Sequence, residues 1–326
     1  QFNGGRQVIS ASGIVNPATG RVSHEMTREE IHGMVDKFVT GAVYAQQANA
    51  DGVELHCAHG YLLHQFLSPH SNVRTDEYGG CLENRMRIVR EIIEGIHCAC
   101  GRDFPISVRI NGCDYIPEGL QKADAVEIAK LLEHYGVSCI NVSSGGYENP
   151  AAFIEPCYFP EGWQQENALA VKAAVQIPVI AAGGIADGRG MAAALMLGAK
   201  GVQIGTRFVA TRECQVHQNY KDCILKAKDI DTRVTGRSTG HPVRALRNQM
   251  TRKYLELENA GAGFEELEKL TLGGLRKAVV EGDVKNGSVM AGQIAGMVKE
   301  RMSCKELVQK LVNETDALIG GKGFYE

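Results

Sequence analysis

The chain has 326 residues, enough for one large α/β domain or two smaller ones. Its 44% hydrophobic and 22% charged residues are typical of a soluble globular protein, and a net charge of −3 without a basic run argues against nucleic-acid and membrane-surface partners. No uninterrupted apolar segment approaches the roughly 18 residues of a membrane span, so no transmembrane helix is predicted.

Short apolar strands alternate with helices along the first two thirds of the chain. Thr27 and Glu30 form the sequence pattern of a capping box, which predicts a helix that continues to about residue 48. The strands predicted after it are 53–56, 106–110, 139–142, 178–182 and 202–205, and the helices between them are 84–98, 123–135, 167–175 and 190–197. This alternation predicts a parallel sheet with right-handed crossovers.

Beyond about residue 211 the composition changes, because charged residues become more frequent and no further strand is predicted. The segments 265–270, 275–280 and 289–299 have helical patterns. We therefore predict a domain over 1–212 and a helical region over 213–326. The fold class is α/β, a (β/α)8 TIM barrel with five clear strands and Phe2 as the end of a sixth, so about two βα units are missing from its start. Because the chain begins at Gln1 without a signal peptide, we expect a segment of a longer or trimmed product.

The most informative segment is 53–62, where a short strand leads into a turn with two imidazoles and a phenol. Polar side chains at the C-terminal end of a parallel strand lie at the active face of barrel and doubly wound enzymes. His56 and His59 can donate hydrogen bonds to one substrate oxygen, and Tyr61 can supply a proton. This set suits reduction of a double bond conjugated to a carbonyl or nitro group. The alternative is that the histidines only cap backbone groups.

Glycine turns follow the last two predicted strands, Gly183 and Gly184 after one and Gly205 with Thr206 after the other. Small residues let backbone N–H groups approach a phosphate, and the following helix adds a favourable dipole. The last two strands of a barrel often bind phosphate in this way. These four residues are therefore predicted to bind phosphate, and the alternative is that the glycines serve only tight turns.

Arg109 lies in the predicted strand 106–110, where a guanidinium that faces the barrel interior or its top needs an anionic partner. The N1–C2=O edge of a reduced flavin is such a partner, and a structural ion pair with a carboxylate is the alternative. The ten cysteines include no CxxC pair. We therefore predict no metal or iron–sulfur site, and buried free thiols in a reducing cytoplasm.

Residues 1 to about 177 resemble the Old Yellow Enzyme family of FMN-dependent NADH:flavin oxidoreductases, and most nearly its two-enoate and dienoyl reductase branch. The resemblance rests on QFNGGRQ at 1–7, ELHCAHGY at 54–61, QFLSP at 65–69 and NVRTDEYGGCLENR at 72–85. It implies an FMN barrel in which Gln1 and Arg109 contact the flavin, His56 and His59 bind the substrate and Tyr61 donates the proton. The iron–sulfur cysteine cluster of that branch is absent from the sequence.

From about Pro178 the chain resembles flavin-dependent enoyl-acyl-carrier-protein reductases and nitronate monooxygenases. This resemblance rests on GGIADGRGMAAA at 183–194, GTRFVAT at 205–211 and GSVMAGQ at 287–293. Both families are FMN barrels with phosphate at the last two strands, so a junction near Ile177 preserves the cofactor site and the chain resembles a hybrid. The second family places its catalytic histidine after a Gly-Gly pair, where this chain has Tyr147, which disfavours the reactions of that family.

Together these features predict an oxidoreductase of the ene-reductase type that uses FMN and NAD(P)H on a small unsaturated carbonyl substrate. Nicotinamide reduces the flavin, which then passes hydride to the activated alkene. The alternatives are a nitronate monooxygenase-like or acyl-carrier enoyl reductase, a non-catalytic truncated flavoprotein, and a flavin-free phosphate-binding lyase or isomerase. A homo-oligomer is among the expectations, and neither NADH nor NADPH is preferred.

Overall fold

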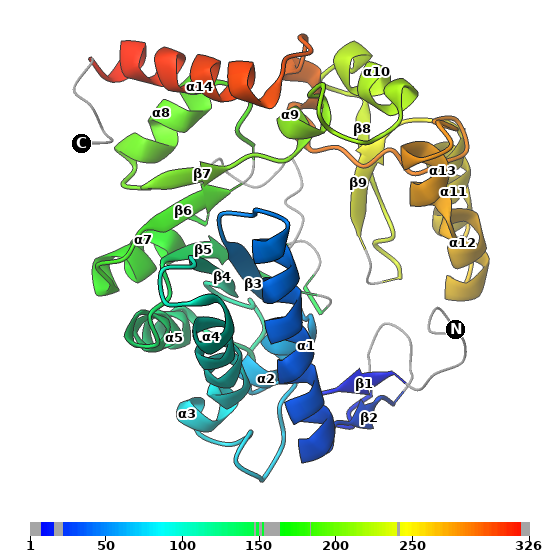
Figure 1. Ribbon diagram of the computed structural model, residues 1–326. Coiled ribbons are helices and arrows are strands. Elements are labelled where there is room, and N and C mark those ends of the chain that lie inside the picture. The colour runs from blue at the N-terminus through cyan, green and yellow to red at the C-terminus, as the bar shows by residue number, and fades with distance from the viewer. Residues whose placement is uncertain are drawn as a thin grey trace. The chain divides into compact units, whose positions relative to one another are not determined.

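The computed structural model describes residues 8–15, 22–146, 148–149, 152, 164–182, 184–239 and 242–320 (Figure 1). Two predicted site residues, Gln1 and Gly183, lie outside the described residues, as do Phe2 and Tyr147. The chain divides into two compact units, Gln1–Ile180 and Ala181–Glu326. The predicted domain boundary at residue 212 falls inside the second unit and stays a prediction.

The first unit alternates strands and helices as predicted. The capping box at Thr27 is confirmed, because the Thr27 N–H donates to Glu30 Oε2 at 2.8 Å and the Glu30 N–H donates to Thr27 Oγ1 at 3.2 Å. In chain order the elements are β1 Ile9–Ser10, β2 His24–Glu25, α1 Arg28–Gln47, β3 Val53–Cys57, α2 Leu62–Leu67, α3 Leu82–Arg85, α4 Arg87–Cys100, β4 Ile106–Asn111, α5 Lys122–His134, β5 Cys139–Ser143, α7 Gln165–Ala174 and β6 Val179–Ala182.

The sheet that carries the site is parallel, as the sequence predicts. Its strand order is β3-β4-β5-β6-β7, and the pairs β3–β4, β4–β5 and β5–β6 are parallel. In the described part of the chain this sheet holds five strands, while β1 and β2 form a separate two-stranded sheet. The register sets His56 opposite Arg109 and Asn111 opposite Ser143, so polar residues of three neighbouring strands lie close together.

The two faces of β3, β4 and β5 differ in polarity because side chains alternate along each strand. One face is apolar and buried, and consists of Leu55, Cys57, Ile106, Val108, Ile110 and Ile140. This face belongs to one core with the isoleucines of α4 and the apolar side of α5. The opposite face is polar and consists of Glu54, His56, Ser107, Arg109, Asn111, Asn141 and Ser143. Burial of the apolar face thus fixes which side chains the strands present for chemistry.

The second unit is mostly helical, and its elements are α8 Gly188–Met196, β7 Gly201–Gln203, α9 Thr206–Val209, α10 Gln218–Lys226, β8 Thr232–Thr235, β9 Val243–Leu246, α11 Gln249–Asn259, α12 Phe264–Thr271, α13 Gly274–Val279, the 3-10 helix η1 Gln293–Met297 and α14 Cys304–Ile319. Helices α8 and α14 lie side by side (Figure 1). Two hydrogen bonds link them, from the Gly188 N–H to Glu314 Oε2 at 2.9 Å and from Thr315 Oγ1 to the Gly188 carbonyl at 3.2 Å.

The structure corrects the prediction for residues 213–326 in two places. The region is not wholly helical, because β8 and β9 form an antiparallel pair in which Thr232 is opposite Leu246. Their short sequences, TRVT and VRAL, each carry an arginine and gave no clear alternation. The predicted helix 289–299 is only the short η1, since glycines 292 and 296 interrupt it. Among the described helices, none combines the length and apolar character that a membrane crossing requires.

Candidate active site

The end of β3 and the tight turn that follows it carry the three residues predicted to be catalytic. His56 is on the polar face of the strand, and His59 and Gly60 follow with φ angles of +65° and +77°. Tyr61 is then the N-cap residue of α2. Two consecutive left-handed residues reverse the chain sharply, which returns Tyr61 toward the strand end. Glycine adopts this conformation readily, and histidine is among the residues that tolerate it best.

The three aromatic rings lie next to one another, with His56 in the centre. Its ring centroid is 5.0 Å from that of His59, at an interplanar angle of 66°, and 5.1 Å from that of Tyr61, at 47°. Their exposure differs, because Tyr61 is 44% exposed and His59 only 5%. The structure therefore brings together the predicted trio, with the phenol accessible and one imidazole buried.

Ser143, which the sequence analysis did not identify, connects this trio to Arg109. Arg109 Nη2 donates to Ser143 Oγ at 3.1 Å, and the same oxygen lies 2.7 Å from His59 Nε2. These three residues come from the ends of three neighbouring strands or from the turn that follows one of them. A signal was present in the sequence, since Ser143 directly follows the predicted strand 139–142, but its partner depends on strand order.

Burial and positive charge keep both imidazoles neutral. Desolvation and the nearby Arg109 guanidinium lower the pKa of His56, although Glu54 opposes this effect. The same causes, with further contributions from His56 and His64, lower the pKa of His59 to about 2. Burial also lowers the pKa of Arg109, again opposed by Glu54. At neutral pH each imidazole therefore carries one N–H donor, and the positive charge of the cluster is on Arg109.

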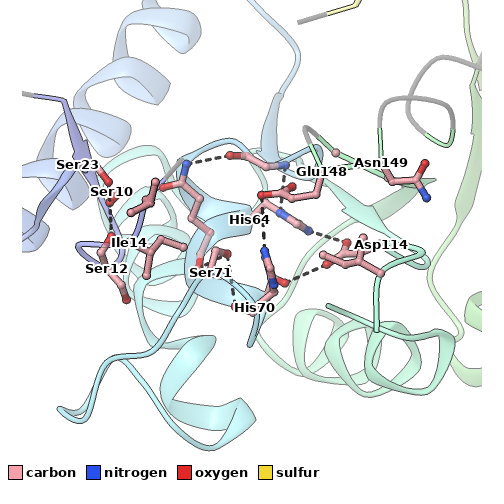
Figure 2. A pocket seen from close by; sticks show the side chains of 17 residues that line it. Ser10, Ser12, Ile14, Ser23, His64, His70, Ser71, Asp114, Glu148 and Asn149 are labelled. Atoms are coloured by element: carbon pink, nitrogen blue, oxygen red, sulfur yellow. Dashed lines mark hydrogen bonds and ion pairs between the residues drawn. The ribbon is translucent and has the colours of Figure 1, made fainter. Parts of the chain in front are cut away.

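A second group of polar residues, also missed by the sequence analysis, lies beneath the turn. His64, Asn111 and Asp114 are all at most 5% exposed, and His64 Nε2 is 2.9 Å from Asp114 Oδ1. His64 and Asp114 border a cavity of about 80 Å³, which is also lined by Ser10 of β1, by Ser23 just before β2, and by the segments after β4 and β5. Figure 2 shows His64 and Asp114 pointing toward one another, with His70 near them. The Nε2 atom of His70 is 3.8 Å from Glu148 Oε1. The lining of this cavity includes Gly60 but not His56 or Tyr61.

The predicted phosphate ligands lie in the second unit. Gly184 is exposed with a φ of +70°, and Gly205 is the exposed N-cap residue of α9. A Cβ atom added at either glycine would meet no heavy atom within 4 Å, so open space adjoins both backbones. Thr206 Oγ1 accepts a hydrogen bond of 2.9 Å from the Gly292 N–H, which links α9 to the start of η1. The hydroxyl proton of Thr206 is thus available as a donor.

Residues 7–221 match the NADH:flavin oxidoreductase / NADH oxidase family, and residues 160–314 match nitronate monooxygenase. The chain is 42% identical over 183 residues to an NADH oxidase of Thermoanaerobacter brockii, which covers 56% of this chain and 28% of that protein. It is 40% identical over 181 residues to an NADPH dehydrogenase of Bacillus subtilis strain 168, which covers 56% of this chain and 52% of that protein. The chain thus spans about half or less of the length of these curated relatives.

Among solved structures, FabK from Thermotoga maritima is similar along nearly the whole chain. The match covers 97% of this chain and 94% of that one, at 27% identity and a TM-score of 0.55. The two overlapping family matches and this neighbour confirm the hybrid resemblance, with the predicted junction near Ile177 inside the overlap 160–221. The fold is that of the α/β TIM-barrel flavoenzymes, as predicted.

Proposed function

The chain belongs to the NADH:flavin oxidoreductase / NADH oxidase family, and from that premise we propose that it is an FMN- and NAD(P)H-dependent ene-reductase. The observation that carries the proposal is the cluster after β3, where two neutral imidazoles and an accessible phenol have adjacent rings. Such a set can bind and protonate an unsaturated carbonyl compound. A lone capping histidine would not account for three adjacent polar rings at the end of β3 and in the turn that follows it.

Residues in each unit fit a flavin mononucleotide. In the first unit Arg109 is a partly buried guanidinium on the polar face, and it suits the anionic edge of a reduced flavin. In the second unit the open space at Gly184 and Gly205 lets backbone N–H groups approach a phosphate. We propose these residues as FMN ligands, together with Thr206 and with Gln1 and Gly183, which lie outside the described residues.

When bound, the flavin supplies the hydride that it has received from NAD(P)H. His56 donates an N–H to the carbonyl oxygen of the substrate, and His59, whose Nε2 lies 2.7 Å from Ser143 Oγ, binds the same oxygen. Both imidazoles are neutral and Arg109 lies close by, so hydrogen bonds and the positive charge stabilise the negative charge that develops on this oxygen. The imidazoles keep their protons in this step. Tyr61 protonates the α-carbon from its exposed position.

The proposal is tested with the purified chain loaded with FMN and freed of excess cofactor. A retained, structured flavin absorption band is expected, which NADH or NADPH bleaches under anaerobic conditions. A cyclic enone such as 2-cyclohexenone should then restore the oxidised spectrum and appear as the saturated ketone. A bleached flavin that only oxygen reoxidises would reject ene reduction while leaving the flavin assignment intact.

A second candidate follows from the match of residues 160–314 to nitronate monooxygenase and from the whole-chain likeness to FabK. In this alternative the chain oxidises a nitronate with oxygen, or reduces an enoyl thioester. Oxygen consumption with propyl-2-nitronate in the absence of nicotinamide would favour the first of these reactions. Turnover of crotonyl-coenzyme A without turnover of the enone would favour the second.

A further inference from the structure

The local sequence alone does not stabilise the conformation of the turn that carries His59 and Tyr61. A left-handed conformation is strained for a residue other than glycine, and here His59 has it directly before Gly60. Such a turn persists only where its surroundings hold it.

Three buried or part-buried side chains bind the polar backbone atoms of the turn. The His59 N–H donates to Asn111 Oδ1 at 3.3 Å, and the Gly60 N–H donates to His64 Nδ1 at 3.1 Å. The Gly60 carbonyl accepts from Gln65 Nε2 at 2.9 Å. His64 is four residues after Gly60, so the first turn of α2 returns the imidazole to the turn that precedes the helix.

These contacts determine the tautomer of His64. A backbone N–H can only donate, so Nδ1 must be the unprotonated acceptor and Nε2 carries the proton. Nε2 then donates to Asp114 Oδ1 at 2.9 Å. Asn111 Nδ2 also lies 3.2 Å from Nε2, but its two hydrogens point to Asp114 Oδ1 and the Gly145 carbonyl, each at 2.7 Å.

Asp114 holds His64 in this orientation because its carboxylate is itself fully bound. Besides His64 and Asn111 it accepts from Ser68 Oγ at 2.9 Å and from the Leu120 N–H at 2.8 Å. Burial alone would raise the pKa of Asp114, but the interaction with His64 and the hydrogen bonds from Asn111 and the Leu120 N–H outweigh it and lower the pKa. The carboxylate is therefore charged at neutral pH and selects the tautomer with the proton on His64 Nε2.

We propose that His64 is a positioning residue for the active site: held by Asp114, its Nδ1 fixes the Gly60 N–H and thereby the places of His59 and Tyr61. The inference rests on the proposed function for its catalytic consequence and on the hydrogen bonds of the turn for its structural part. A turn released from His64 can relax toward ordinary backbone angles, which moves Tyr61 relative to His56. A shift of about 1 Å in a reacting group can cost on the order of 10²-fold in rate.

Two substitutions test the two ring nitrogens of His64 separately. In His64→Asn the amide oxygen takes the place of Nδ1 and can accept from Gly60, whereas the contact with Asp114 is lost. In His64→Gln the amide nitrogen takes the place of Nε2 and can donate to Asp114, whereas Gly60 loses its acceptor. We expect kcat for enone reduction to fall by on the order of 10²-fold in H64Q and by less than about tenfold in H64N. Flavin reduction by NAD(P)H should stay at the wild-type rate in both.

The exposed His134 at the end of α5 provides the matched control, and His134→Gln should leave every rate unchanged. Equal losses in H64N and H64Q, or wild-type rates in both, would overturn the proposal. A rise in KM with kcat unchanged in H64Q would do the same, because it would place His64 in substrate binding instead.

Two spectroscopic measurements on the wild-type chain and H64N need no enone turnover, so they separate this inference from the proposed function. Nitrogen-15 NMR of labelled histidines should show His64 with an unprotonated Nδ1 and a protonated Nε2 at neutral pH. The Gly60 amide should exchange slowly with solvent in both proteins, and rapidly in H64Q if that variant folds. A protonated Nδ1, or rapid Gly60 exchange in the wild type, would overturn the inference even where enone reduction is observed.

Discussion

The turn after β3 and the glycine turns of the second unit serve binding in opposite ways. Between His56 and Tyr61 the backbone is held by side chains, and each polar atom of Gly60 has a partner. At Gly184 and Gly205 the backbone faces open space that a Cβ could enter without contact. The first arrangement places particular side chains accurately, and the second leaves backbone N–H groups accessible to a compact anion.

This difference predicts different responses to substitution. At the turn after β3, a change should affect the rate or the stability, because strain and buried hydrogen bonds depend on it. At the glycine turns, a change should affect mainly ligand affinity, because little in the second unit packs against them. The following experiments test that contrast, from the largest expected effect to the smallest.

Removal of the Tyr61 hydroxyl should have the largest effect. Tyr61→Phe keeps the ring beside His56 but removes the proton donor, so enone reduction should slow by about 10²–10⁴-fold. Flavin reduction by NAD(P)H should be unaffected. Stopped-flow absorbance of the two half-reactions measures both rates, and an equal loss in the two would remove Tyr61 from the proton-transfer role.

Loss of the buried Asp114 carboxylate beneath the turn should destabilise the folded protein. Asp114→Asn should lower the free energy of unfolding by about 2–4 kcal/mol at pH 7, since one amide oxygen replaces a carboxylate with four donors. The pKa of Asp114 is lowered in the folded state, so its contribution is present above the unfolded value near 3.8 and is lost as the pH falls through the folded value. Urea unfolding at several pH values measures the difference in the free energy of unfolding between the variant and the wild type. This difference should be constant above about pH 5 and smaller below it. A difference that increases in acid would contradict this account.

The open space at Gly205 should be needed by the cofactor and not by the fold. Gly205→Val places a side chain where the phosphate is proposed, so FMN affinity should fall by about tenfold or more, equivalent to about 1.4 kcal/mol. Its φ of −96° suits any residue, so the melting temperature without FMN should change little. The control is Gly41→Ala in α1, where a Cβ also meets nothing, and it should stabilise the chain by about 0.5–1 kcal/mol without affecting FMN. Unchanged FMN affinity in Gly205→Val would place the phosphate elsewhere.

The buried imidazole should contribute a modest pH dependence of stability. The pKa of His59 is about 2 when folded, so the unfolded chain binds a proton below its ordinary value of 6.5 and the folded chain does not. Stability from this group is complete above about pH 6.5 and falls as the pH decreases toward the folded value. His59→Asn, which tolerates the same positive φ, should reduce the proton uptake on unfolding at about pH 5 by about one. The proton uptake is obtained from the change in the free energy of unfolding between neighbouring pH values. An equal uptake in the variant and the wild type would mean that His59 is protonated in the folded protein.

Much of the architecture could be predicted from local sequence. The pattern of apolar residues gave all five strands of the main sheet and their helices, and Thr27 with Glu30 gave the start of α1. The short helix α2 was not predicted, since six residues directly after a turn show no clear period. The β8–β9 pair was missed because its strands are four residues long and each carries an arginine. Of the candidate site, His56, His59 and Tyr61 could be identified because they are neighbours in the chain.

The sequence by itself determined which residues have reactive side chains, where strands end, and to which flavoprotein families the segments are similar. The tertiary structure decided the partners: Ser143 meets His59 across 84 residues, Asn111 meets the same turn across 52, and Asp114 meets His64 across 50. These contacts follow from the parallel order β3-β4-β5, which sets the ends of separate strands side by side. Hydrogen bonds act over about 3 Å, and only the sheet register brings residues so distant in sequence within that range.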